Sequence, residues 1–196
     1  PNANALVSEE RVAQAEKLIA AAGFVVCQLE IPVASTLAAL RLARQHNVRT
    51  VLNPSPVPRE VAPVVDALPM VDYLIVNETE ASELSMQSKV ASLDDAAAAA
   101  KALLQKGVRK AVVVTLGEHG GVVVEKDLTV NAFTCPKVTA RDTTGAGDSF
   151  LGAFVHFLLA GHTEAEAAKV AARVASYSCE KPGCQPSYLD LKQFAE

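Results

Sequence analysis

Short apolar runs alternate along the chain with stretches in which apolar residues recur every three or four positions. The short runs predict buried strands, and the recurrence predicts amphipathic helices. In the first part of the chain, strands are predicted at 24–29, 50–52, 73–76 and 111–115, and helices at 8–22, 32–47, 78–84 and 92–106. Because apolar strands alternate with helices, the sequence predicts a doubly wound, mostly parallel sheet with helices on both faces.

The first predicted helix, 8–22, is expected to be capped by Ser8. One face of it carries Val12, Ala15, Leu18 and Ile19. The segment 53–63 is rich in proline and is therefore predicted to be a loop.

After residue 111 the strands follow one another directly. Strands at 121–125 and 128–133 are joined by a tight turn at Lys126-Asp127, which predicts an antiparallel hairpin at the sheet edge. Helices are predicted at 150–159 and 163–178, and a final short helix is predicted to start at Ser187. No linker or change in composition divides residues 1–196, so a single α/β domain is expected.

Composition and charge exclude several classes of function. The formal net charge is −4 and the 18 basic residues are scattered, so no nucleic-acid partner is expected. No apolar run has membrane-spanning length, and the first residues lack the pattern of a secretory signal. The four cysteines have neither zinc-site nor redox-pair spacing, which favours a reducing, cytoplasmic compartment.

The run 142–150, Asp-Thr-Thr-Gly-Ala-Gly-Asp-Ser-Phe, carries the clearest chemical signal. A glycine-rich turn lets successive N–H groups face one point, and the following helix adds its positive N-terminal end, so the two predict an anion cradle. Asp148 is predicted in the first helical turn, where a carboxylate can take a proton from a hydroxyl that attacks phosphorus. The residue types alone also fit an ordinary turn and helix cap.

Ligands of such sheets bind at the carboxyl ends of the strands. The residues expected on this rim, together with the glycine-rich loop, are Glu30, Asn53, Asn77, Glu80, Thr115 and Gly117. Asn77 and Glu80 also have the spacing of a helix N-cap with its third-position carboxylate, as do Ser92 and Asp95.

Three motifs in this order resemble the ribokinase-type (phosphofructokinase B-type) family of sugar and nucleoside kinases. Along the chain they are the Asn-x-x-Glu motif at 77–80, Thr115-Leu116-Gly117 followed by Gly120-Gly121, and the 142–148 run. The resemblance covers essentially the whole chain and implies a ribokinase-like fold. Within the family, the segments 28–30, 53–54 and 185–187 look most like the members that act on ribose.

The resemblance implies ATP-dependent phosphorylation of D-ribose at its 5-hydroxyl. Asp148 would be the general base, and Glu30 would bind the sugar. The anion hole would be the backbone of Gly145, Ala146 and Gly147. The nucleotide would contact Asn77, Thr115, Gly117, Gly120 and Gly147, and Glu80 would act on Mg²⁺ through water.

The resemblance also implies a monovalent-cation site, for K⁺, beside the glycine-rich loop. Its oxygen ligands would come from Asp142, Thr144, Ser178, Lys181, Gly183 and Ser187. A hard cation suits one carboxylate with several neutral oxygens.

The family's N-terminal portion, with its sugar-binding Asp, its Gly-Gly/Lys segment and its lid, has no match in this chain. We therefore expect an N-terminally incomplete protein without the lid, which leaves an apolar sheet edge, and a homodimer only in a full-length form. Two alternatives stay open: a family kinase for another sugar or nucleoside, and a non-catalytic ATP-binding fragment or subunit.

Overall fold

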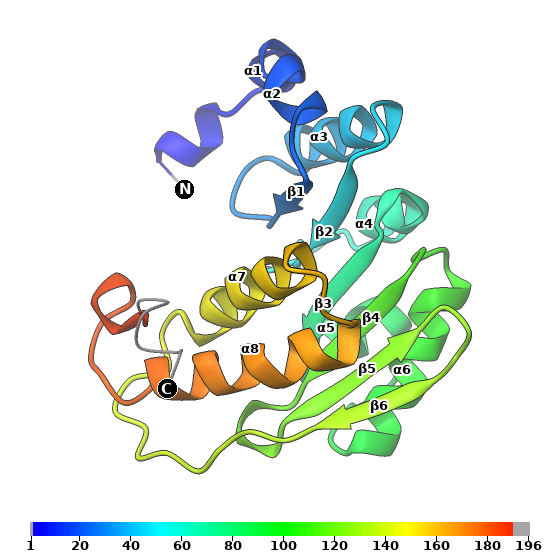
Figure 1. The fold of residues 1–196 in the computed structure, drawn as a ribbon. Coiled ribbons are helices and arrows are strands. Elements are labelled where there is room, and N and C mark those ends of the chain that lie inside the picture. The colour runs from blue at the N-terminus through cyan, green and yellow to red at the C-terminus, as the bar shows by residue number, and fades with distance from the viewer. Residues whose placement is uncertain (1, 190–196) are drawn as a thin grey trace.

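A six-stranded sheet runs through the computed structural model, which describes residues 2–189 (Figure 1). The strands lie in chain order: β1 (Phe24–Cys27), β2 (Arg49–Leu52), β3 (Tyr73–Asn77), β4 (Ala111–Thr115), β5 (Gly121–Glu125) and β6 (Val130–Phe133). The first four pair in parallel, whereas β5 and β6 pair antiparallel. This arrangement confirms the predicted mostly parallel sheet with an antiparallel edge.

Helices cover both faces of the sheet, as predicted (Figure 1). One face packs against α3 (Val33–Gln45), α4 (Ala62–Ala67), α5 (Glu78–Ser85) and α6 (Leu93–Gln105). The other face packs against α7 (Ala146–Leu159) and α8 (Glu164–Ser178). Side chains alternate along each strand, so Val112 and Val114 face the first set of helices and Ala111 and Val113 the second.

The first predicted helix is wrong in its length and in its buried face. Two short helices, α1 (Glu9–Gln14) and α2 (Glu16–Ala20), replace it, and the break falls at Ala15. Val12 is buried against the core, but Leu18 is 76% exposed. A short helix draws most of its stability from packing, and α2 has no buried residue to hold it in line with α1. The predicted cap is confirmed, because the Ser8 hydroxyl accepts the Arg11 N–H at 3.3 Å.

Other boundaries also differ from the prediction, among them the end of β1 at Cys27 and the start of α7 at Ala146. The turn between β5 and β6 extends to Thr129, because Leu128 adopts a positive φ of 71° and donates its N–H to the Glu125 carbonyl. Helix α4 begins at Ala62, inside the segment predicted as a loop. The short helix predicted from Ser187 is a 3₁₀ turn at Gln185–Ser187, and the continuation of that prediction lies outside the described residues.

At the amino ends of the strands, Asp72 links β2 to the start of β3. Its side chain is 4% exposed and accepts the Thr50 N–H at 3.0 Å. The guanidinium groups of Arg109 and Arg44 lie 3.2 Å and 3.9 Å from its oxygens. A buried carboxylate needs partners of this kind, so this cluster stabilises the edge opposite the candidate site.

The carboxyl ends of β1–β4 and the start of α7 lie at the opposite ends of the strands from Asp72 (Figure 1). Within residues 2–189, no helix combines the length and the apolar character needed to cross a lipid bilayer.

Candidate active site

The glycine-rich loop is anchored at its first residue. The Asp142 carboxylate accepts the Gly183 N–H at 2.8 Å and the Thr144 N–H at 2.9 Å. The Arg141 N–H donates to the Cys179 carbonyl oxygen at 2.8 Å, so the loop is also held by its backbone. These N–H groups, that of Gly183 first, lower the pKa of Asp142 below its ordinary value. Asp142 therefore stays ionised and fixes the loop against the segment after α8.

Gly145 forms the junction between this loop and α7. It is the N-cap of the helix and has a φ of +79°, which non-glycine residues rarely adopt. A Cβ at this position would overlap the Sγ of Cys184 and would lie 2.6 Å from the Tyr188 hydroxyl oxygen. Cys184 Sγ and the Tyr188 hydroxyl are themselves 2.8 Å apart. Glycine is therefore required both by the backbone and by the two side chains packed on it.

The start of α7 presents backbone N–H groups, as expected for an anion cradle. The Ala146 N–H donates to the Thr143 carbonyl oxygen at 3.2 Å, so it forms part of the turn. Gly147 and Asp148 occupy the first helical turn, where N–H groups have no partner within the helix. In this first turn, the N–H groups best placed to receive an anion are therefore those of Gly147 and Asp148 rather than that of Ala146.

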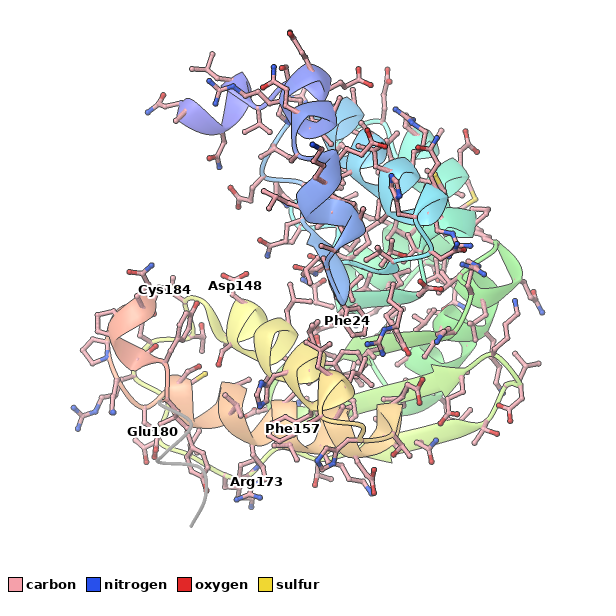
Figure 2. All side chains as sticks on the ribbon, turned by 45° about the horizontal axis from the view of Figure 1, so that its top comes forward. Phe24, Asp148, Phe157, Arg173, Glu180 and Cys184 are labelled. Atoms are coloured by element: carbon pink, nitrogen blue, oxygen red, sulfur yellow. The ribbon has the colours of Figure 1, made fainter. Side chains whose placement is uncertain are left out.

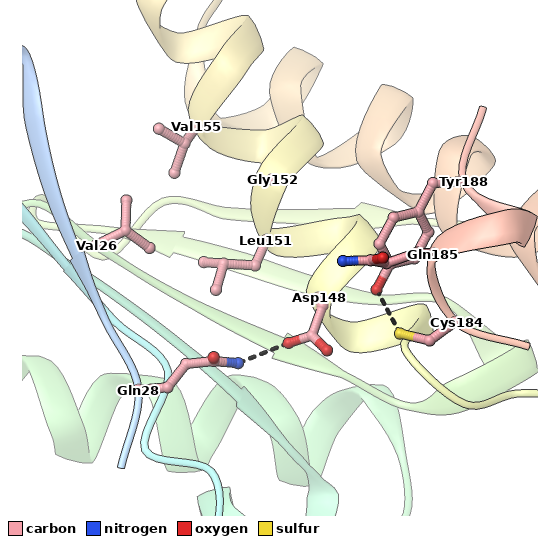
Figure 3. A pocket seen from close by; sticks show the side chains of 9 residues that line it. All are labelled: Val26, Gln28, Asp148, Leu151, Gly152, Val155, Cys184, Gln185 and Tyr188. Atoms are coloured by element: carbon pink, nitrogen blue, oxygen red, sulfur yellow. Dashed lines mark hydrogen bonds between the residues drawn. The ribbon is translucent and has the colours of Figure 1, made fainter. Parts of the chain in front are cut away.

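Asp148 is exposed in the first turn of α7, and Figure 2 shows it at the same end of the molecule as Cys184. The Gln28 side-chain amide, just after β1, donates to Asp148 Oδ1 at 2.6 Å (Figure 3). Both residues line a hollow of about 580 Å³ between β1 and α7. Apolar side chains of Val26, Leu151 and Val155 form another part of its wall. Asp148, the base predicted from the sequence, thus lies with Gln28 in the polar part of the wall of a partly apolar hollow.

Asn77 and Glu80 form the predicted capping box at the start of α5. The Asn77 Oδ1 accepts the Glu80 N–H at 2.9 Å, and the Glu80 carboxylate accepts the Asn77 N–H at 3.0 Å. Glu80 is 5% exposed, and burial raises its pKa while the Asn77 N–H opposes this rise. Ser92 and Asp95 form a second capping box on α6, also as predicted.

Thr115 lies beside this capping box and is followed by the three glycines of its motif, Gly117, Gly120 and Gly121. In the sheet register Thr115 pairs with Asn77 on one side and with Gly121 on the other. Gly117 and Gly120 have positive φ values of 54° and 84° in the turn that follows β4. The sheet therefore places Asn77 next to Thr115 and the turn that follows it, whereas Gly147, also predicted to contact the nucleotide, lies in α7.

Other predicted site residues are less closely connected. Within residues 2–189, the exposed side chains of Glu30 and Lys181 make no hydrogen bond. Ser178 and Ser187 are buried, and their hydroxyls donate to the Ala175 and Cys184 carbonyl oxygens.

The residues proposed for a monovalent cation fit such an ion chemically. Two lone pairs of the Asp142 carboxylate are used by N–H groups, and a carboxylate offers about four acceptor positions. Asp142 therefore keeps oxygen positions for a cation, and the 178–183 segment, which has neutral carbonyl oxygens, contacts it through the Gly183 N–H.

The sequence did not assign roles to Gln28, Cys184 and Tyr188 at this site. Gln28 and Asp148 are 120 positions apart, and Tyr188 and Gly145 are 43 apart. No local pattern signals such contacts, because they depend on how β1, α7 and the segment after α8 pack together.

Comparison with known proteins identifies the class. The profile of the pfkB family carbohydrate kinases matches residues 1–191, and the chain belongs to this family. The predicted resemblance is thereby confirmed.

Individual relatives lie within the same class. A ribokinase of Staphylococcus aureus is 37% identical over 197 residues, covering 97% of this chain and 61% of that protein. A deoxyribokinase of Salmonella typhi is 33% identical over 196 residues, covering 99% and 62%. The structure of Arabidopsis thaliana ribokinase complexed with ribose and ATP has a TM-score of 0.80 at 27% identity, covering 93% and 57%. The chain spans about six tenths of the length of the curated relatives it matches.

Proposed function

We propose that the chain carries the catalytic centre of an ATP-dependent kinase that phosphorylates D-ribose at its 5-hydroxyl. The observation that carries this proposal is the position of Asp148: an exposed carboxylate in the first turn of α7, beside N–H groups that suit an anion and at the wall of a hollow. Family membership and the ribokinase relative at 37% identity support the same activity.

In the proposed reaction, Asp148 takes the proton from the sugar hydroxyl as its oxygen attacks the γ-phosphorus of ATP. The bond between this phosphorus and the β,γ-bridging oxygen breaks, and ADP leaves. Negative charge on the transferred group would be held by N–H groups at the start of α7 after Gly145. Donors fixed in a helix need no reorganisation during the reaction, so they stabilise this charge more than mobile water would.

The nucleotide would lie along the ends of β3 and β4, beside Asn77, Thr115, Gly117 and Gly120. Mg²⁺ supplies neutralising charge at the phosphates when it is bound, and it favours waters and a few oxygen ligands. Glu80 fits a water-mediated role because its carboxylate is fixed by the Asn77 N–H. Asp142 would likewise hold K⁺, which links the ion to the geometry of the glycine-rich loop.

Phosphorylation of 2-deoxyribose is a second candidate, because the deoxyribokinase relative matches 99% of this chain. The two sugars share the 5-hydroxyl and differ only at carbon 2, so the proposed chemistry at Asp148 serves both. Glu30 is the residue of the chain that we propose for sugar binding, and it is exposed and follows β1.

The proposal is tested by calorimetry of ATP binding, with Mg²⁺ and K⁺ present, and by ADP release with ribose, with deoxyribose and without sugar. ATP binding with ribose-dependent ADP release supports the proposed kinase. Faster release with deoxyribose favours the second candidate. ATP binding without any sugar-dependent release indicates a nucleotide-binding portion that does not act alone, and absence of ATP binding contradicts the proposal.

A further inference from the structure

We propose that Gln28 is the positioning residue of the general base: it fixes the Asp148 carboxylate so that one oxygen accepts the Gln28 amide and the other is left for the substrate hydroxyl. This inference rests on the proposed function, because it assigns Asp148 the role of base. It starts from the 2.6 Å distance between Gln28 Nε2 and Asp148 Oδ1. Figure 3 shows the two side chains meeting across the space between β1 and α7.

The orientation of the Gln28 amide is determined by a chain of hydrogen bonds. The Ile75 backbone carbonyl can only accept, and the Asn53 Nδ2 donates to it at 3.0 Å. The Asn53 Oδ1 must then face Gln28, and it accepts from Gln28 Nε2 at 3.3 Å. An amide nitrogen has two hydrogens, so the second one is directed at Asp148. A reversed amide would place an oxygen against two acceptors.

The backbone around Gln28 is also held in place. The Thr36 hydroxyl, on a residue that is fully buried in α3, donates to the Gln28 carbonyl oxygen at 3.1 Å. The next residue, Leu29, donates its N–H to the Ser55 carbonyl at 3.0 Å, and the Asn53 N–H donates to the Cys27 carbonyl at 2.9 Å. The backbone of Gln28 is therefore fixed just after β1, beside the end of β2.

Asp148 needs such a donor because its side chain is exposed. A free aspartate at the start of a helix samples several rotamers, and few of them direct an oxygen at one substrate atom. Catalysis by a base requires that geometry, and a displacement of about 1 Å can reduce the rate by about 10²-fold. An amide donor selects the rotamer without adding a charge. We therefore expect Gln28→Met, which keeps the length and removes the donor, to lower kcat by about 10- to 100-fold and to leave ATP affinity unchanged.

A double-mutant cycle separates positioning from a merely structural role. Gln28→Met, Asp148→Asn and the double variant are compared by sugar-dependent ADP release, with Gln45→Met, at the exposed end of α3, as the control. If Gln28 acts through Asp148, the double variant is no slower than Asp148→Asn alone. If the two losses multiply, or if Gln28→Met slows turnover no more than Gln45→Met does, the inference is wrong.

The pH dependence gives a signature with a definite sign. Gln28→Glu places a second carboxylate against Asp148. Two carboxylates at such a short distance cannot both ionise easily and tend to share one proton. The acidic limb of the kcat/KM profile for the sugar should therefore move to higher pH in this variant. An acidic limb at the wild-type position contradicts the contact.

Nuclear magnetic resonance tests whether Gln28 contacts Asp148 even if the chain has no turnover. The side-chain amide signals of Gln28, identified by their loss in Gln28→Met, should shift in Asp148→Asn while those of Gln45 stay in place. Unshifted Gln28 signals overturn the inference whatever the activity. Shifted signals in a protein that binds no ATP keep the positioning contact and reject the proposed function instead, so the two failures are distinguishable.

Discussion

Replacing Gly145 by alanine tests whether the junction before α7 is as tightly constrained as its geometry indicates. The left-handed backbone at φ +79° costs a non-glycine residue about 1–2 kcal/mol. The added Cβ must also displace Cys184 and Tyr188, whose Sγ and hydroxyl oxygen form a hydrogen bond of 2.8 Å. Loss of one hydrogen bond costs about 1 kcal/mol. The sum is a loss of about 2–3 kcal/mol, or roughly 5–10 °C in Tm for a domain of this size.

The assay is thermal unfolding followed by circular dichroism, with Gly152→Ala as the matched control. Gly152 lies within α7, and a Cβ there would meet no atom within 4 Å. Alanine in a helix interior is favoured over glycine by about 0.5–1 kcal/mol, so the control should unfold slightly above the wild type. If Gly145→Ala unfolds at or above the wild-type temperature, the packing argument at this junction is refuted.

Hydrogen bonds at the site and at the opposite ends of the strands give three further predictions. Asn77→Ala and Ser92→Ala each remove a helix N-cap, and each should lower the free energy of unfolding in urea by about 1 kcal/mol. Only Asn77→Ala should also weaken ATP binding. If the two variants bind ATP with equal affinity, Asn77 does not belong to the nucleotide site. The pKa of Asp142 is lower in the folded state, so its contribution to stability is present above the unfolded-state pKa of about 4 and is lost as pH falls through the folded-state value. Asp142→Asn should therefore flatten the decrease of Tm at acidic pH. A decrease identical to that of the wild type would contradict this. Asp72→Ala leaves the buried Thr50 N–H without its acceptor and should lower the free energy of unfolding by about 2 kcal/mol without changing ATP affinity, whereas a loss below about 0.5 kcal/mol would show that the cluster adds little.

The sequence predicted the elements whose signals are local. The first four residues of the strand at 111–115 form an apolar run that is buried on both faces, so its pattern needed no knowledge of its neighbours. The capping boxes at Asn77 and Ser92 place both partners three residues apart, and both were found where expected. The glycine-rich turn and its helix are likewise contiguous, which is why Asp148 could be placed in the first turn.

The failures fall where distant packing decides the outcome. Helix 8–22 has helical periodicity, but α2 finds no core to bury Leu18 against, so the pattern breaks at Ala15. The contact between Gln28 and Asp148 joins residues 120 positions apart, and no spacing rule could anticipate it. The sugar-binding role of Glu30 followed from the resemblance, and it remains a prediction.

Whether Asp148 is the base of a sugar kinase is decided by comparing ribose-dependent ADP formation in the wild type and in Asp148→Asn. If Asp148 is the base, the variant binds ATP with wild-type affinity and turns over at least about 10²-fold more slowly, as expected when a general base is lost. Turnover within about tenfold of the wild type would show that another group takes the proton.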